Sequence, residues 1–239
     1  MKIDVLGVQF HNVDMQEAKK QALDAILERK AAYVCTPNPE IVWNAGEDAT
    51  LKAALAGAKL VLADGVGITL GAKLLKTPLK ARIPGIDFAT NLIAHLAENG
   101  QSVFLYGAKP GIAEQAAENL KQTHQGLMIA GVVDGYGDKN EVIAAINAAA
   151  PDFLMVCLGS PKQELWMQEN AGSLNVGLMA GLGGALDVFS GTVKRAPKIW
   201  QKLGLEWFYR LCKEPRRIGR MMKLPLFLLA VCKRAILKR

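Results

Sequence analysis

The chain has 239 residues, of which 51% are hydrophobic and 21% are charged, and its formal net charge at pH 7 is +7. This length suffices for one domain with a full hydrophobic core, and no apolar stretch approaches the roughly 20 residues that a membrane-spanning helix needs. The four cysteines show no Cys-x-x-Cys spacing and no His, Cys and acidic cluster has zinc-site spacing, which argues against a disulfide framework and against structural zinc.

The first predicted element is a helix that begins after Asp14. Asp is a favourable N-cap, and Glu17 stands at the capping-box position. Six apolar runs of strand length follow at residues 32–36, 59–63, 103–106, 128–133, 153–158 and 176–180, with helical patterns between them, for example at 112–122 and 139–149. Strands that alternate with helices predict an α/β fold with a mostly parallel sheet and helices on both faces.

Glycine and polar residues stand directly after each predicted strand. The six segments are residues 36–40 (Thr-Pro-Asn-Pro-Glu), 64–67 (Asp-Gly-Val-Gly), 107–111 (Gly-Ala-Lys-Pro-Gly), 134–138 (Asp-Gly-Tyr-Gly-Asp), 159–164 (Gly-Ser-Pro-Lys-Gln-Glu) and 181–184 (Gly-Leu-Gly-Gly). In open parallel sheets, ligands bind beyond the carboxyl ends of the strands. We therefore expect these segments to form one site.

Two of these segments could bind phosphate. Residues 107–111 follow a strand and precede a helix, and residues 181–184 have a similar composition. Backbone N–H groups at a helix N-terminus attract phosphate, although tight turns need glycine in any case. The Walker pattern of P-loop enzymes is absent. The spacing Gly65-x-Gly67-x-x-x-Gly71 resembles a dinucleotide fingerprint but departs from it by one residue.

Asp64 is a candidate general base because it ends a predicted strand beside two glycines. An equally good reading from position alone is that it caps the helix that begins at Val66. Glu40, Asp87 and Glu164 compete with it for the role of base.

Basic residues near these segments could neutralise a diphosphate, although each is more commonly a surface charge. They are Arg82, Lys109, Lys162, Lys194 and Arg195. No Asp-x-Asp occurs in the chain, so the carboxylate pair that many nucleotide-sugar enzymes use to hold a divalent metal is missing.

The last part of the chain differs from the rest in charge. Residues 192–239 hold fourteen Lys and Arg and two acids, whereas residues 1–191 hold fifteen bases and twenty acids. Trp, Phe, Leu and Met interleave with these bases, and residues 224–231 form an apolar run broken only by Pro225. A basic amphipathic segment of this kind is typical of proteins that bind an anionic membrane surface, although a solvated helix face is the alternative.

Taken together, the motifs resemble the WecG/TagA/CpsF glycosyltransferase family from about residue 5 to residue 220. The resemblance rests on residues 36–40, 63–67, 82–87 (Arg-Ile-Pro-Gly-Ile-Asp), 106–111, 159–164, 181–184 and 195–197 (Arg-Ala-Pro). It implies a Rossmann-like glycosyltransferase domain at residues 1–194 and a basic, amphipathic and helical appendage at residues 195–239 that associates with the membrane. It also implies an inverting hexosyltransferase that moves N-acetylmannosamine from its UDP donor to undecaprenyl-diphosphate-linked N-acetylglucosamine, for wall teichoic acid or a related surface polysaccharide.

The resemblance also implies residue roles. Asp64 is the expected catalytic base, and Thr36, Asn38, Gln163 and Arg82 are expected to bind substrate. The expected nucleotide end comprises Gly107, Ala108, Lys109, Gly135, Tyr136, Gly183, Gly184 and Asp187. The arginines expected at the lipid diphosphate are Arg210, Arg216, Arg217 and Arg220. We expect no metal cofactor.

Partners and location follow from the same observations. The N-terminus lacks the apolar region of a signal peptide, so we expect a cytoplasmic protein that is peripheral on the inner face of the cell membrane. The resemblance implies a UDP-sugar and a lipid-linked acceptor as partners, and the basic tail predicts an anionic membrane surface as a third. A homo-oligomer could cover the apolar tail. A uronic acid donor remains an alternative, and a nicotinamide oxidoreductase or a nucleic-acid-binding protein fits the motifs poorly.

Overall fold

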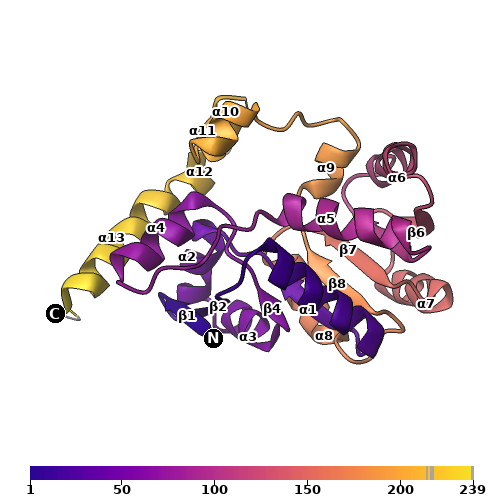
Figure 1. Cartoon of the computed structure of the whole chain (residues 1–239), viewed down its shortest axis with the longest axis horizontal. Helices are drawn as coiled ribbons and strands as arrows, with labels where there is room; N and C mark the ends of the chain where they lie inside the picture. Colours follow the sequence, from indigo (N-terminus) through magenta and orange to yellow (C-terminus); the bar gives the residue numbers. More distant parts are fainter. Residues whose placement is uncertain (214, 216–217, 238–239) are drawn as a thin grey trace.

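The centre of the molecule is a six-stranded parallel sheet (Figure 1). The computed structural model describes residues 1–213, 215 and 218–237. The strands are β3 (Ala32–Cys35), β4 (Leu60–Val61), β5 (Ser102–Gly107), β6 (Met128–Val133), β7 (Phe153–Cys157) and β8 (Leu178–Gly181), and their order across the sheet is β4-β3-β8-β7-β5-β6. The parallel sheet predicted from the alternating pattern is confirmed.

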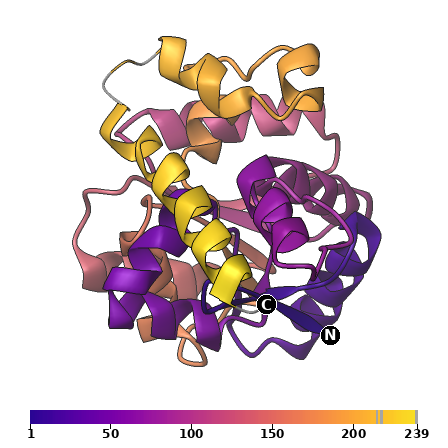
Figure 2. The same ribbon diagram turned by 90° about the vertical axis from the view of Figure 1, so that its left-hand side faces the viewer.

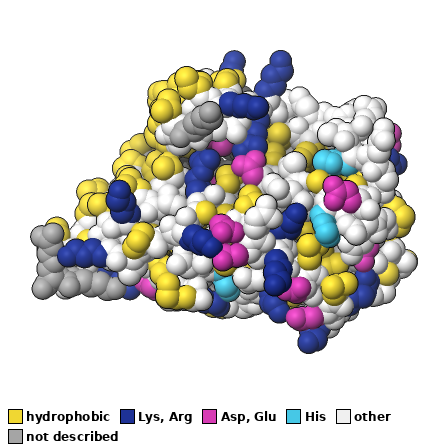
Figure 3. All heavy atoms as spheres, viewed as in Figure 1, with side chains coloured by type: hydrophobic (Ala, Val, Ile, Leu, Met, Phe, Trp, Pro, Cys, Tyr) yellow, Lys and Arg dark blue, Asp and Glu magenta, His cyan; other side chains and the backbone are white. Residues whose placement is uncertain are grey.

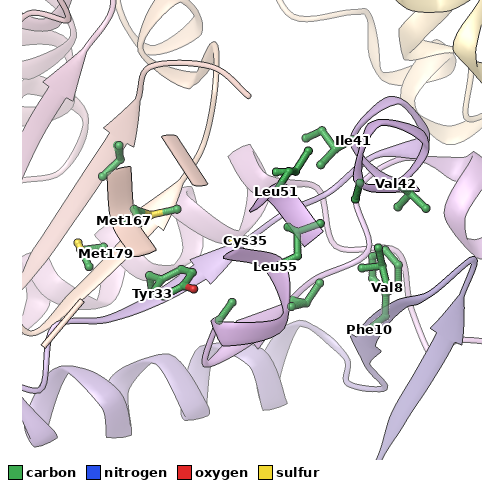
Figure 4. Close-up of a cluster of buried hydrophobic side chains, with 14 of the residues drawn as sticks. Val8, Phe10, Tyr33, Cys35, Ile41, Val42, Leu51, Leu55, Met167 and Met179 are labelled. Atoms are coloured by element: carbon green, nitrogen blue, oxygen red, sulfur yellow. The ribbon is translucent and has the colours of Figure 1, made fainter. Parts of the chain in front are cut away.

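Helices cover both faces of this sheet. One core includes side chains of α1 (Met15–Glu28), α5 (Gly85–Glu98), α6 (Ile112–Thr123) and α9 (Ala185–Phe189). The other includes side chains of α2 (Pro39–Glu47), α3 (Ala49–Gly57), α7 (Lys139–Ala149) and α8 (Lys162–Asn170). Alternate strand residues point to opposite faces. Accordingly, Tyr33 and Cys35 belong to the second core, which Figure 4 shows in part, and Val34 belongs to the first.

The capping box predicted for the first helix is present. The Asp14 side chain accepts a hydrogen bond from the Glu17 N–H at 3.0 Å, and the Glu17 carboxylate accepts one from the Asp14 N–H at 2.9 Å. Two helix N–H groups that lack intrahelical partners are thus satisfied reciprocally.

An N-terminal hairpin was not predicted from the sequence. Strands β1 (Lys2–Val5) and β2 (Val8–His11) pair antiparallel through the two-residue turn Leu6-Gly7, whose φ angles of 52° and 91° are both positive. Such turns favour Asn or Gly at both positions, and Leu6 departs from this pattern, so the sequence did not indicate a hairpin turn. The imidazole Nδ1 of His11 accepts a hydrogen bond from the Val61 N–H at 2.9 Å, which attaches the hairpin beside β4.

The basic C-terminal part is helical, as predicted, and it folds back on the body. Its helices are α10 (Lys198–Lys202), α11 (Glu206–Lys213), α12 (Ile218–Met221) and α13 (Lys223–Leu237). Helix α13 packs against α2 and α4 (Val66–Leu74), and Figure 2 shows it lying along that side of the body. No helix in the part of the chain that the structure describes is long and apolar enough to cross a membrane.

Polar contacts fix both ends of α13. The Lys223 ammonium donates to Asn44 Oδ1 in α2 at 2.6 Å, and the Arg234 guanidinium forms an ion pair with Asp4 in β1 at 2.8 Å. Between these contacts, Phe227 and Val231 are fully buried. One side of the apolar run in the tail therefore belongs to the core of the protein.

Two glycines of α4 allow α13 to approach closely. A Cβ on Gly67 would lie 2.6 Å from Pro39 Cγ and 2.9 Å from Leu224 Cδ1. A Cβ on Gly71 would lie 3.1 Å from two ring carbons of Phe227. Residues four apart share one face of a helix. The spacing that resembles a dinucleotide fingerprint is thus a helix-packing seam, defined here as Gly67 and Gly71.

We predict that Gly67→Ala lowers the free energy of unfolding by about 1–3 kcal/mol, the usual cost of overpacking, although Ala favours a helix. Equilibrium urea denaturation measures the change. The control is Gly46→Ala in α2, where an added Cβ meets no atom within 4 Å; its stability should be unchanged or slightly raised. Equal stability of the two variants would contradict the packing role of the seam.

Candidate active site

Asp64 lies just beyond β4 and faces the start of α5. Its backbone N–H donates to the Pro37 carbonyl at 3.3 Å, and its Oδ2 accepts a hydrogen bond from the Gly85 N–H at 3.4 Å. The N-cap of α4 is Gly65, without a side-chain cap, so the alternative of Asp64 as that cap is wrong. The N-terminus of a helix favours a nearby carboxylate, and α5 therefore helps to hold Asp64 in the site.

Thr36 and Asn38 follow β3 and lie beside Asp64. The buried Thr36 hydroxyl donates to the Gly181 carbonyl at 3.1 Å, which ties the end of β3 to the end of β8. Asn38 Oδ1 accepts a hydrogen bond from the Ile41 N–H at 3.0 Å and caps α2. Among the described residues, the Asn38 Nδ2 group has no protein partner, so it remains able to donate to a ligand.

Two pockets meet at Asp64 and Asn38, which line both. The strand-end pocket has a volume of about 350 Å³ and is lined by Thr36, Asn38, Ile41, Asp64, residues 157–160, Gln163, residues 182–184, Asp187, Val188 and Val193. The tail pocket has a volume of about 180 Å³ and is lined by residues 38–40, 64–67, Arg82, Pro84, Ile86, Gly204, Glu206, Trp207 and Leu224. The site therefore has two compartments with one carboxylate between them.

Besides Asp64 and Asn38, six predicted site residues line the two pockets. Thr36, Gln163, Gly183, Gly184 and Asp187 line the strand-end pocket, and Arg82 lines the tail pocket. The Arg82 guanidinium also approaches the Gln201 carbonyl of α10 at 3.5 Å.

Five predicted nucleotide-binding residues line neither pocket. Gly107 ends β5, Ala108 and Lys109 follow it, and Gly135 and Tyr136 follow β6. The Gly135 N–H donates to the Ala108 carbonyl at 2.9 Å, so the two loops contact each other. A Cβ on Gly135 would lie 3.2 Å from Leu158, which lines the strand-end pocket. These loops therefore border that pocket.

The arginines predicted at the lipid diphosphate cannot be placed. Arg216 and Arg217 lie outside the described residues, as do the side chains of Arg210 and Arg220. Their roles stay predictions.

The carboxylates that competed with Asp64 have other surroundings. Asp87 accepts two hydrogen bonds from the Arg195 guanidinium. Glu164 is 1% exposed, and its Oε1 accepts a hydrogen bond from the Gln163 amide at 2.9 Å. Glu40 lines the tail pocket but not the strand-end pocket. Asp64 is the one acid among the four candidates that lines both.

Arg195 connects the sheet domain to the tail. Besides its paired bonds to Asp87 in the first turn of α5, its Nε lies 3.5 Å from Glu206 Oε1 in α11. The Asp87 carboxylate raises the pKa of the Arg195 guanidinium. Glu206 and its neighbour Trp207 both line the tail pocket. Arg195 therefore holds α11 at the wall of that pocket.

Sequence reasoning missed the tail residues that complete the site. The tail pocket is lined by Gly204, Glu206, Trp207 and Leu224, although they are 140 to 160 residues beyond Asp64 in the chain. The one available signal was that Glu206 is one of two acids in a strongly basic segment. In the part of the chain that the structure describes, no group of three His, Cys, Asp or Glu side chains is arranged to hold a metal ion.

We predict that Arg195→Ala loosens α11. Losing hydrogen bonds to charged partners should lower the free energy of unfolding by about 1.5–3 kcal/mol, and backbone amides of residues 204–209 should exchange faster with deuterium. The control is Arg29→Ala, which removes a surface ion pair with Asp152 at 3.3 Å; such pairs contribute about 0–1 kcal/mol. Unchanged exchange at residues 204–209 in Arg195→Ala would refute the connecting role.

Comparison with known proteins identifies the family of the chain. Residues 3–239 match the family described as "Glycosyl transferase WecG/TagA/CpsF family". The N-acetylglucosaminyldiphosphoundecaprenol N-acetyl-beta-D-mannosaminyltransferase of Bacillus spizizenii is 39% identical over 207 residues, which cover 86% of this chain and 80% of that protein. A protein of the same name from Staphylococcus aureus strain MW2 is 35% identical over 236 residues, or 97% of this chain and 92% of that protein. The chain therefore belongs to the WecG/TagA/CpsF family of glycosyltransferases.

Proposed function

We propose that this protein is an inverting glycosyltransferase that moves N-acetylmannosamine from UDP-N-acetylmannosamine to undecaprenyl-diphosphate-linked N-acetylglucosamine. The product is a lipid-linked disaccharide for wall teichoic acid or a related surface polysaccharide. Family membership and the names of the two relatives support this reaction.

The observation that carries the proposal is the position of Asp64 between two pockets. A transfer between two large substrates needs a compartment for each and a base where they meet. The strand-end pocket takes the donor, since glycine-rich turns line it. The tail pocket takes the acceptor, because its apolar wall includes Val66, Trp207 and Leu224 and it also contains the cation Arg82.

The reaction is a single displacement. Asp64 accepts the proton of the acceptor sugar hydroxyl, and that oxygen forms a bond to the anomeric carbon of the donor. The bond from this carbon to the diphosphate breaks at the same time, and UDP leaves with the electron pair. Attack from the face opposite to UDP inverts the configuration of the anomeric carbon.

The lining of the strand-end pocket favours a neutral donor sugar over its uronic acid. Among the described residues, this pocket contains Asp64 and Asp187 but no Lys or Arg. A sugar carboxylate would meet like charges there without a cation, which is unfavourable. N-acetylmannosamine is therefore the donor we propose.

The proposed reaction uses no divalent metal. The support for this is the lack of any Asp-x-Asp in the sequence. Backbone N–H groups of the glycine-rich turns then stabilise the leaving diphosphate.

Asp64→Asn tests the proposed base. The assay incubates protein with UDP-N-acetylmannosamine and a short-chain prenyl-diphosphate N-acetylglucosamine in EDTA, and follows UDP release and the mass of the lipid. The wild type should yield a lipid heavier by one N-acetylhexosamine, and Asp64→Asn should lower kcat by about 10²–10⁴-fold while still binding UDP. Full kcat in Asp64→Asn would eliminate the base assignment, and no product with the wild type would eliminate the reaction.

We also propose that the tail binds the anionic cytoplasmic leaflet, since the acceptor is a membrane lipid. Hydrophobic side chains gather with Lys and Arg over the tail helices (Figure 3). Leu226 and Leu229 of α13 are 42% and 67% exposed, on the side of the helix away from Phe227 and Val231. Each basic residue near such a surface contributes about 1 kcal/mol.

The double variant Leu226→Ser/Leu229→Ser tests membrane binding in the full-length chain. Burying a Leu side chain contributes about 1.5–3 kcal/mol, so its affinity for vesicles of anionic phospholipid should fall at least about tenfold in sedimentation. The control Leu27→Ser changes a side chain of α1 that is 77% exposed, and it should bind like the wild type. Undiminished binding of the double variant would contradict the membrane role.

A further inference from the structure

Two polar side chains are buried side by side next to the strand-end pocket. Gln163 and Glu164 are the second and third residues of α8, and they are 3% and 1% exposed. Glutamate is rarely buried to this degree unless it is paired. The proposed mechanism does not use Glu164, so its burial needs another explanation.

Glu164 makes one side-chain hydrogen bond, and the Ser160 hydroxyl is a second polar neighbour. Its Oε1 accepts a hydrogen bond from Gln163 Nε2 at 2.9 Å, whereas its Oε2 is buried without a hydrogen-bond partner among the described residues. No Lys, Arg or His among the residues that the structure describes forms an ion pair with Glu164. Burial raises the pKa of Glu164, and the Gln163 amide and the Ser160 hydroxyl offset this only in part. The Cys35 thiol of β3 lies in the same environment, where burial also raises its pKa.

The Gln163 amide is held from both ends. Its Nε2 donates to Glu164, and its Oε1 accepts a hydrogen bond from the Gly183 N–H at 2.9 Å. If the amide were turned over, oxygen would face oxygen at Glu164 and N–H would face N–H at Gly183. The acceptor at Glu164 and the donor at Gly183 therefore allow only one orientation of the Gln163 amide.

The orientation of the Gln163 amide affects the lining of the strand-end pocket. Gln163 and Gly183 both line it, together with Asp64. A Cβ on Gly181 would lie 3.0 Å from Gln163 Nε2, so the amide rests directly on the backbone of β8. Nε2 has a second hydrogen beyond the one that it gives to Glu164, and this hydrogen is available to a ligand.

We propose that Glu164 is a positioning residue: it orients the Gln163 amide, which in turn fixes the Gly183 backbone against the sugar diphosphate of the donor. The inference rests on the proposed function, since it assigns the strand-end pocket to the donor.

A double-mutant cycle tests whether Glu164 acts through Gln163. The proteins are the wild type, Glu164→Ala, Gln163→Ala and Glu164→Ala/Gln163→Ala, and the readout is kcat/KM for UDP-N-acetylmannosamine at saturating acceptor. Loss of one hydrogen bond corresponds to about a tenfold decrease, which we expect for Glu164→Ala. The double variant should be no worse than Gln163→Ala, and KM for the acceptor should be unchanged in all four.

Glu164→Gln is the conservative control, because its Oε1 can still accept from Gln163. We expect kcat/KM within about twofold of the wild type and a similar pH profile between pH 6 and 8. If Glu164→Ala does not fold, as judged by its melting temperature, the inference is decided by Glu164→Gln compared with Gln163→Ala.

Three results would overturn the inference: multiplicative effects of the two alanine substitutions on kcat/KM, an unimpaired Glu164→Ala, or a folded Glu164→Gln that loses as much activity as Gln163→Ala. Each is distinct from failure of the proposed function, in which the wild type itself would release no UDP.

Discussion

The close approach of α13 to α4 is the contact on which the two-compartment site depends. It requires glycine at 67 and 71, since a Cβ at either position would contact Pro39, Leu224 or Phe227. Pro39 begins α2 directly after Asn38, and Leu224 lines the tail pocket. The same seam thus contacts both the loop after β3 and the tail. Without this packing, the pocket beside Asp64 would lose one wall.

The sheet forms the other half of the site. The carboxyl ends of parallel strands lie at one edge, so the sheet topology alone brings together the segments after β3, β4, β7 and β8. The backbone then does much of the positioning, because the Thr36 hydroxyl binds the Gly181 carbonyl and the Gly85 N–H binds Asp64. The tail is attached to this edge through Arg195, which contacts Asp87 in the body and Glu206 in α11.

The sequence predicted the features that depend on local pattern. Apolar runs and glycine-rich turns located the strands and their ends, and Asp14 and Glu17 located the start of α1. It did not predict which elements pack together. The glycines at 67 and 71 were visible, but their partner is a helix about 150 residues away. Asp87 looked like a possible base because its partner Arg195 is 108 residues away in the chain. Long-range contacts of this kind leave no periodic signal.

The tail combines two roles in one helix. Phe227 and Val231 are buried against the body, whereas Leu226 and Leu229 remain exposed on the other side. Membrane binding through the exposed side would therefore bring the tail pocket close to the lipid surface, where a lipid-linked acceptor resides. The excess of basic residues in residues 192–239 lies in the same part of the chain as Leu226 and Leu229.

Hydrogen–deuterium exchange with each ligand alone tests the two-compartment account most directly. UDP should slow exchange at residues 158–164 and 182–188, and a short-chain prenyl-diphosphate N-acetylglucosamine should slow it at residues 82–86 and 204–207. Each ligand should leave the other set unchanged. Protection of the same peptides by both ligands, or protection of residues 204–207 by UDP alone, would contradict the division of the site at Asp64.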